Sequence, residues 1–313
     1  DRNSYLISSE RGETRAHIRG ALRYENEESS GLPVVGDYVV ATGDAGSVAI
    51  SAVLPRKNLF ARRAVDRSHS LQAIAANLDT LFITVALNRD FNTRRIARYA
   101  VGAAACDVPF VVLLSKADLV DDCTIFVDAV KDAIPDANVI VLSSIDGTGM
   151  RSLDPYRVEG KTLAFVGSSG VGKSTLINTL LESATLSVES ARADDDRGRH
   201  TTTRRLLLEL NDGTCIIDTP GMREFGLADA EAGLEAILTD VTDVAKSCKF
   251  RDCRHDSEPG CAVRDNIDEL RLANFRKLEK EAAFEARKQD PLLLKAERAK
   301  WKAIQKANRN RIR

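Results

Sequence analysis

No apolar run in this sequence approaches the roughly 18 to 20 residues that a membrane-spanning helix needs, which excludes an integral membrane protein. An excess of charge of one sign is also lacking. Because 45 lysine and arginine residues stand against 46 acidic residues, the chain is not a uniformly basic nucleic-acid binder. Internal repeats and low-complexity stretches are absent. With 43% hydrophobic and 29% charged residues, the 313-residue chain has an ordinary globular composition and predicts two or three domains.

Basic charge is nevertheless concentrated at two places. Residues 291–313 hold eight basic residues against one acidic residue, which indicates a basic tail. A second cluster consists of Arg56, Arg62, Arg63 and Arg67, which either contacts phosphates or is simply solvated. A local basic surface therefore remains compatible with the balanced net charge.

The evenly spaced cysteines of a small secreted scaffold are missing too. Cys106, Cys123 and Cys215 are scattered, whereas the other three cysteines fall within fourteen residues of one another. We therefore expect reduced thiols and a metal site rather than disulfides. No signal peptide opens the chain, and we expect a cytoplasmic protein. The first residue is Asp1 rather than Met, so a short native segment or a cleaved targeting segment is left open.

Three segments differ in pattern. Residues 1–72 carry short β-like runs broken by glycine and polar turns, which predict an OB-type β-barrel or another small β domain. Residues 73–229 alternate apolar strands with helical stretches, which indicates an α/β domain with a parallel sheet and helices on both faces. Residues 230–313 are helical, apart from a Cys/His cluster and the basic tail. The strands expected in the α/β domain are 80–86, 109–114, 139–142, 162–166, 204–210 and 214–217, and the helices are 93–106, 125–133 and 173–181.

A phosphate-binding loop is predicted at Gly167–Ser174, which matches G-x-x-x-x-G-K-[ST] between an apolar strand and a helix. The glycines let successive N–H groups face the phosphates. We expect Lys173 to reach the β- and γ-phosphates and the Ser174 hydroxyl to bind Mg²⁺. The predicted nucleotide-binding residues of this segment are Gly167, Ser168, Ser169, Gly170, Val171, Gly172, Lys173, Ser174 and Thr175.

Asp218-Thr219-Pro220-Gly221 follows the predicted strand at 214–217. An acid in that place supplies the second Mg²⁺ contact, and the backbone N–H of Gly221 approaches the γ-phosphate. Taken alone, the same four residues could form a simple turn.

A guanine-reading loop is predicted at Ser115-Lys116-Ala117-Asp118, after the strand at 109–114. In GTPases an [NT]-K-x-D loop occupies this place, and its aspartate accepts hydrogen bonds from the guanine N1–H and 2-amino groups. Ser143 and Ser144 resemble the loop that contacts the guanine O6. Both base loops precede the phosphate loop, whereas an ordinary GTPase has the reverse order. The order therefore predicts a circularly permuted GTPase, whose site stays intact because domain termini are often close together.

Cys248, Cys253, His255 and Cys261 supply three thiolates and an imidazole within fourteen residues. Four such ligands predict a closed tetrahedral Zn²⁺ site with a structural role, one ion per chain. Lys249, Arg251 and Arg254 lie beside the ligands in sequence, and we expect them to be exposed, which would suit nucleic-acid phosphates.

These motifs resemble the ribosome small subunit-dependent GTPase A family, a group of circularly permuted ribosome biogenesis GTPases. The most specific pieces are Gly198–Thr203 (Gly-Arg-His-Thr-Thr-Thr) and the Cys/His cluster, and the resemblance covers nearly the whole chain. It implies an OB-type barrel, a permuted GTPase and a C-terminal zinc module. It also implies a GTP hydrolase that uses Mg²⁺ and acts as a switch with the small (30S) ribosomal subunit and its 16S rRNA. We expect the protein to be a monomer. Ser115 and Ser144 depart from the family pattern, where asparagine and alanine are usual.

In the predicted switch, Thr202 is the candidate hydroxyl that closes on Mg²⁺, with Thr201 as the alternative. Met222 stands where Ras-like proteins carry the glutamine that orients water, which methionine cannot do. The resemblance makes His200 the candidate catalytic group. Two rival functions stay open: a P-loop enzyme of another class, such as a small-molecule kinase, and an RNA-binding assembly scaffold with a vestigial nucleotide site.

Overall fold

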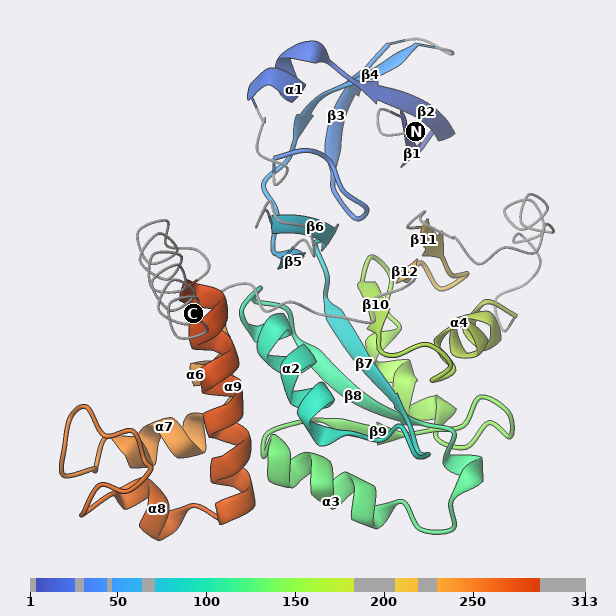
Figure 1. Cartoon of the computed structure of the whole chain (residues 1–313). Helices are drawn as coiled ribbons and strands as arrows, with labels where there is room; N and C mark the ends of the chain where they lie inside the picture. The colour runs from blue at the N-terminus through green and yellow to red at the C-terminus, as the bar shows by residue number, and fades with distance from the viewer. Residues whose placement is uncertain are drawn as a thin grey trace, which may run out of the picture.

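The computed structural model describes residues 4–25, 31–43, 47–63, 71–182, 206–218 and 230–287. The N-terminal module is a four-stranded sheet in the order β1-β2-β4-β3 (Figure 1). Strands β2 and β4 are parallel, and the two outer pairs are antiparallel. Its elements are β1 (Ser4–Ser9), β2 (Gly12–Ile18), α1 (Gly20–Glu25), β3 (Val39–Thr42) and β4 (Val48–Val53). An OB-fold has five strands, so these four described strands leave the barrel a prediction.

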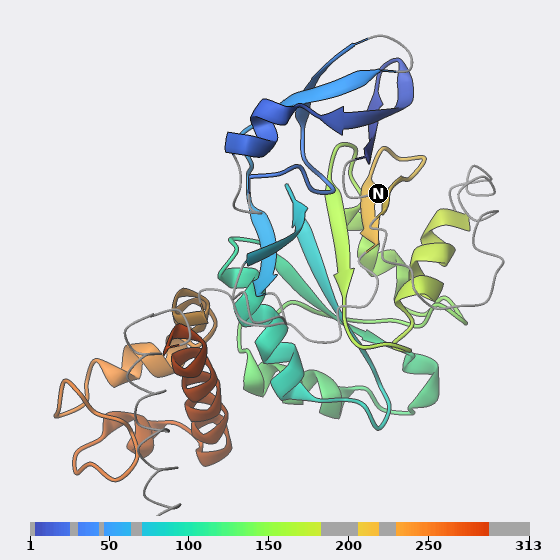
Figure 2. The same ribbon diagram turned by 45° about the horizontal axis from the view of Figure 1, so that its top comes forward.

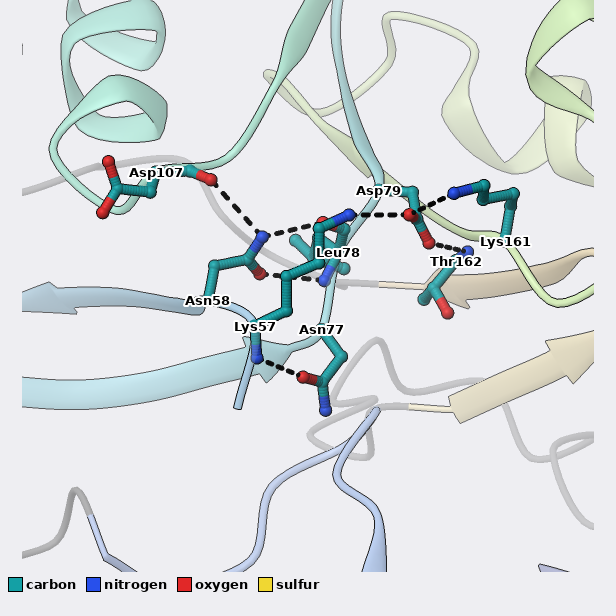
Figure 3. Close-up of polar contacts among 8 residues, drawn as sticks. All are labelled: Lys57, Asn58, Asn77, Leu78, Asp79, Asp107, Lys161 and Thr162. Carbon is teal, nitrogen blue, oxygen red and sulfur yellow. Dashed lines mark hydrogen bonds and ion pairs between the residues drawn. The ribbon is translucent and has the colours of Figure 1, made fainter. Parts of the chain in front are cut away.

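A two-stranded hairpin, β5 (Leu59–Arg63) with β6 (Leu71–Ala76), links this module to the central sheet. Figure 3 shows the polar contacts at the junction. The buried Asn58 amide donates to the Leu78 carbonyl oxygen at 2.8 Å and accepts from the Leu78 N–H at 2.9 Å. Asp79 accepts from Lys57, Lys161 and the N–H of Thr162. Burial alone would raise the pKa of Asp79, but these hydrogen bonds outweigh it and hold that pKa below its usual value.

The basic cluster predicted in this region is divided by the fold. Arg56 forms a 2.7 Å ion pair with Asp37 and donates to the Leu32 carbonyl, so its charge is used inside the module. Arg62 donates to Gln72 at 3.1 Å. Arg67 lies outside the described residues.

The central domain is a six-stranded sheet in the order β11-β12-β10-β7-β8-β9. All neighbouring pairs are parallel except β11 with β12, so the predicted parallel sheet carries an antiparallel edge. Its strands are β7 (Thr80–Ala86), β8 (Phe110–Ser115), β9 (Val139–Val141), β10 (Thr162–Val166), β11 (Leu206–Glu209) and β12 (Cys215–Asp218).

Helices cover both faces of this sheet (Figure 1), which is why β7 and β10 are buried along their whole length. Successive residues of β7 point to opposite faces. Ile83 packs in the core under α2 (Thr93–Ala104) and α3 (Thr124–Ala133). Phe82 packs in the other core, under α4 (Lys173–Glu182) and the 3₁₀ helix η2 (Met150–Tyr156), where it stacks on Phe165 at 5.0 Å.

The C-terminal segment is helical, as predicted, and lies against α2 and α3 (Figures 1 and 2). Leu234 and Phe275 belong to the same buried core as Ile96 of α2, so the module shares its core with the central domain. Arg271 fixes the contact, because it donates to the Ala133 carbonyl of α3 and pairs with Asp240. The helices are α6 (Ala230–Ile237), α7 (Thr239–Ala245), α8 (Ala262–Asn266) and α9 (Glu269–Arg287). No helix within the described ranges has the length and hydropathy to span a bilayer.

Candidate nucleotide-binding site and metal centre

The predicted phosphate loop follows β10, which lies between β12 and β7 at the middle of the sheet. Gly167 has a φ of +145°, and a Cβ atom there would collide with the Thr84 carbonyl oxygen on β7. Glycine is therefore required where the loop leaves its strand. Helix α4 begins at Lys173, so its N-terminal N–H groups face the loop.

Lys173 and Asp218 place opposite charges beside this loop. Lys173 Nζ donates to the carbonyl oxygens of Gly167 and Ser168, both at 2.7 Å. Burial lowers the pKa of Lys173 to about 8, although the Asp218 carboxylate acts in the opposite direction. Burial likewise raises the pKa of Asp218, and Lys173 offsets part of that rise. A second cation would favour the charged form of this carboxylate.

The donor atoms at this edge of the sheet suit Mg²⁺. Asp218 ends β12, and Ser174 is exposed in the first turn of α4. A carboxylate and a hydroxyl are hard oxygen ligands of the kind that Mg²⁺ takes, together with phosphate oxygens and water.

Ser115 connects the predicted base loop to the phosphate loop. Its buried hydroxyl lies 2.6 Å from the Val171 carbonyl oxygen and 3.1 Å from that of Val85. One hydroxyl proton serves one acceptor at a time, and the shorter distance favours Val171. Ser115 therefore makes a direct link between the two loops in the place where an asparagine is usual.

The remaining base-loop residues are held together as a unit. Asp118, in the 3₁₀ helix η1 (Ala117–Leu119), accepts a 2.6 Å hydrogen bond from the fully buried Ser143 hydroxyl. Asp118 is exposed, and its other carboxylate oxygen has no partner in the part of the chain that the structure describes. Lys116 has a left-handed φ of +62°, and its side chain lies over Gly172. Ser144 is half-buried next to Ser143.

The four predicted zinc ligands converge in space. Their ligand atoms all lie within 4.8 Å of one another. His255 Nδ1 is 3.6 Å from Cys248 Sγ and 3.5 Å from Cys261 Sγ. A tetrahedral ion with Zn–S and Zn–N bonds of about 2.3 and 2.0 Å separates sulfur from nitrogen by roughly 3.5 Å. The cluster therefore has the donor set and the spacing of a closed zinc site.

The loop around this cluster has its own supports. Gly260 has a φ of +76°, and its carbonyl accepts from the Lys249 N–H, which turns the chain back toward Cys261. The Glu258 carboxylate accepts from the N–H groups of Arg254, Asp256 and Ser257. The backbone N–H of Glu258 itself contributes most, and together with these three N–H groups it lowers the pKa of Glu258 to about 2.

Comparison of the sequence with known proteins points to one family. The sequence model of the RsgA GTPase family matches residues 53–228. The small ribosomal subunit biogenesis GTPase RsgA of Opitutus terrae is 40% identical, covering 100% of this chain and 89% of its own. The chain belongs to the RsgA GTPase family. The RsgA protein of Methanosarcina acetivorans is also similar, at 41% identity over 93% of this chain and 79% of its own.

Solved structures share the fold of this RsgA GTPase. YjeQ from Thermotoga maritima has a TM-score of 0.63 at 26% identity and covers 90% of this chain and 94% of its own. YloQ, described as a circularly permuted GTPase, has a TM-score of 0.58 at 23% identity, with 90% of both chains covered. The predicted permuted α/β architecture is thereby confirmed.

Several residues predicted for the site of this RsgA GTPase lie outside the described residues. They are His200, Thr201, Thr202, Gly221 and Met222. The basic tail at 291–313 lies outside them as well. Their roles stay predictions from the sequence.

Two residues of this RsgA GTPase were not predicted from the sequence. Arg95 Nη1 donates to the Ser168 hydroxyl of the phosphate loop at 2.5 Å. Arg95 and Ser168 are far apart in the chain, and no sequence motif includes both of them. Glu258 supports the zinc loop, and only its position between two predicted ligands could have indicated this.

Proposed function

We propose that this chain binds GTP with Mg²⁺, hydrolyses it to GDP and phosphate, and acts as a switch in maturation of the small (30S) ribosomal subunit. Family membership and the names of the relatives support this role. The main support for this role is the contact between the predicted base loop and the predicted phosphate loop. Asp118 presents a free carboxylate oxygen to solvent while Ser115 ties its loop to Val171.

Within this proposal each part of the site has a task. Asp118 accepts from the guanine N1–H and 2-amino groups, and Ser143 holds its carboxylate in place. Lys173 exchanges the carbonyls of Gly167 and Ser168 for phosphate oxygens. Ser174, Asp218 and Thr202 would hold Mg²⁺, which neutralises phosphate charge during transfer. His200 is the proposed group that handles the attacking water.

The flanking modules are the proposed contacts with 16S rRNA. Lys249, Arg251 and Arg254 are all exposed around the zinc cluster, where Zn²⁺ would stabilise the loop that presents them. The basic tail adds positive charge beyond them. The N-terminal module supplies the second proposed RNA surface. We propose that the protein acts as a monomer in the cytoplasm, where it would meet assembling small subunits.

Nucleotide selectivity tests the proposal. Titration of the full chain should show binding of GTP and GDP in preference to ATP. Asp118→Asn should weaken GTP binding and favour xanthosine triphosphate, because the 2-oxo group of xanthine needs a donor. Asp122→Asn, an exposed aspartate outside the site, is the matched control. Equal binding of ATP and GTP, or unchanged selectivity in Asp118→Asn, would refute the assignment and favour another class of P-loop enzyme.

In the sequence, Ser115 and Met222 favour the scaffold alternative, with weak or vestigial turnover. Because the Ser115 hydroxyl links the two loops, Met222 is the observation that still favours it. GTP turnover measured with and without small ribosomal subunits separates it from the switch. We expect slow turnover alone and strong acceleration by the subunit, reduced in His200→Ala. Absence of acceleration would favour the scaffold.

A further inference from the structure

Arg95 has no acidic partner among the residues that the structure describes. It lies in the first turn of α2, where its backbone N–H donates to the Asn92 side chain that caps the helix. Helix α2 follows β7, and β7 pairs with β10 in parallel, with Ile83 opposite Val166. The first turn of α2 and the phosphate loop therefore emerge from the same edge of the sheet.

Two positive charges meet at one residue of the phosphate loop. Arg95 donates to the Ser168 hydroxyl at 2.5 Å, and Lys173 donates to the Ser168 carbonyl at 2.7 Å. Among the described residues Arg95 forms no ion pair, and Lys173 has only the longer-range attraction of Asp218. Residues 167–172 contain no acid. Two cations drawn together on neutral oxygens form a site suited to an anion.

The contact between Arg95 and Ser168 is one that a phosphate can replace. A serine hydroxyl is a neutral acceptor, whereas phosphate oxygens form charge-assisted and often bidentate bonds with guanidinium, roughly twice as strong. The arginine side chain is long enough to pivot, and Arg95 is only partly buried. Lys173 undergoes the same exchange in the proposed function.

The sequence also leaves a deficit that such a cation would fill. Met222 stands where a water-orienting glutamine is usual and cannot replace its hydrogen bonds, so other groups must lower the barrier to hydrolysis. Stabilising the charge on the transferred phosphoryl is one way to do so. An arginine supplied in cis is one known solution among GTPases.

We propose that Arg95 is a substrate-contacting residue that leaves Ser168 and binds the terminal phosphate of GTP. This inference rests on the proposed GTPase function and adds a cation to the same site. GDP lacks the terminal phosphate, so in the diphosphate state Arg95 remains on Ser168. The contact thus favours the triphosphate over the diphosphate.

Equilibrium binding of GDP and of a non-hydrolysable GTP analogue, each with Mg²⁺, tests this on the full chain. Arg95→Ala should weaken binding of the analogue on the order of 10- to 100-fold and change GDP binding by about twofold or less. Single-turnover hydrolysis should slow by at least about tenfold. Arg95→Lys, which keeps the charge, should recover part of both losses. Arg89→Ala, an exposed arginine before α2, is the matched control.

Ser168→Ala separates phosphate contact from simple support of the loop. If Arg95 only supports the loop, Ser168→Ala and Arg95→Ala will weaken both nucleotides alike, and the proposal fails. If Arg95 binds phosphate, the preference for the triphosphate is retained in Ser168→Ala and lost in Arg95→Ala. Retained GDP binding shows that the variants are folded. Failure of the GTPase assignment itself would appear differently, as absence of selective guanine-nucleotide binding in the unaltered chain.

Discussion

At the scale of single residues, Ser115 offers one hydroxyl donor where the carboxamide of an asparagine would offer two N–H donors. Two carbonyl oxygens, of Val171 and Val85, lie within its reach, but the hydroxyl has one proton to donate. With serine in place of asparagine, the base loop and the phosphate loop are therefore still linked, but by one hydrogen bond. The sequence alone could not establish this, because the link depends on which carbonyl the fold brings to position 115.

Removing that link should weaken the whole nucleotide site rather than its base selectivity. In Ser115→Ala the buried Val171 carbonyl loses its partner, which we expect to lower the free energy of unfolding by about 1–2 kcal/mol. Binding of GDP and GTP should fall alike, by a few-fold, while GTP is still preferred to ATP. Ser115→Asn should bind at least as tightly as the unaltered chain. Loss of guanine preference in Ser115→Ala would show instead that Ser115 reads the base.

Lys173 should make nucleotide binding sensitive to pH. Its pKa of about 8 in the free protein lies below that of an ordinary lysine because the side chain is buried. Phosphate binding requires the charged form of Lys173. Well below pH 8 this lysine is already charged, so nucleotide affinity should not change with pH there. Above pH 8 the protein must take up a proton to bind, and affinity should fall as pH rises, by up to tenfold per unit. GDP titrations between about pH 6.5 and 9 measure this. Lys173→Arg should bind with a flat profile over that range, and an equal slope in this variant would assign the titration to another group.

At the scale of elements, the long buried strands were predictable because both faces of the sheet are covered. β7 and β10 have the expected bounds, since an uninterrupted apolar run between turns has few other interpretations. The hairpin β5–β6 was not predicted, because its short strands include Arg62 and Arg63 and lack a long apolar run. The antiparallel direction of the edge strand β11 was also not predicted, because alternation of strands and helices in the sequence does not give the direction of an edge strand. The position of Arg95 against the phosphate loop depends on packing between elements far apart in the chain.

The metal-binding loop and the helices around it should respond differently to loss of zinc. If the structural role predicted from the sequence extended to the whole C-terminal module, loss of the metal would unfold all of it. In the structure Leu272, Phe275 and Leu278 of α9 share a core with α2, so that helix has support that does not need the ion. We therefore expect chelation, or Cys253→Ser, to expose residues 246–261 to proteases while α9 and nucleotide binding are retained.

Zinc content and limited proteolysis check this expectation. The unaltered chain should hold one zinc ion and Cys253→Ser much less. Cys123→Ser, which changes a cysteine outside the cluster, should hold the full amount. Cleavage spreading through residues 269–287 in the metal-free protein would show instead that loss of zinc unfolds the whole C-terminal module. A metal-free chain as resistant as the loaded one would remove the structural role of the ion.

At the scale of the whole molecule, two routes join the C-terminal module to the phosphates. One is the chain itself, because the permuted order places this module after Asp218. The other is helix α2. Its first turn carries Arg95, which contacts the phosphate loop, and Arg94, whose Nε donates to Asn274 of α9 at 3.1 Å. A partner that moves α9 therefore acts on the same helical turn that holds Arg95.

Breaking the contact between α2 and α9 should reduce stimulation by the small ribosomal subunit without removing basal hydrolysis. Arg94 and Asn274 contact each other rather than a predicted nucleotide-binding residue. Arg94→Ala and Asn274→Ala should therefore each hydrolyse GTP alone at nearly the normal rate. Stimulation should fall by about 2- to 30-fold, the range expected for coupling of 0.5–2 kcal/mol. The double variant should be no worse than the more impaired single variant, because both changes remove one contact. Additive losses, or a loss of subunit affinity with stimulation intact, would mean that these side chains bind the subunit directly. In that case, coupling would run through the chain after Asp218 alone.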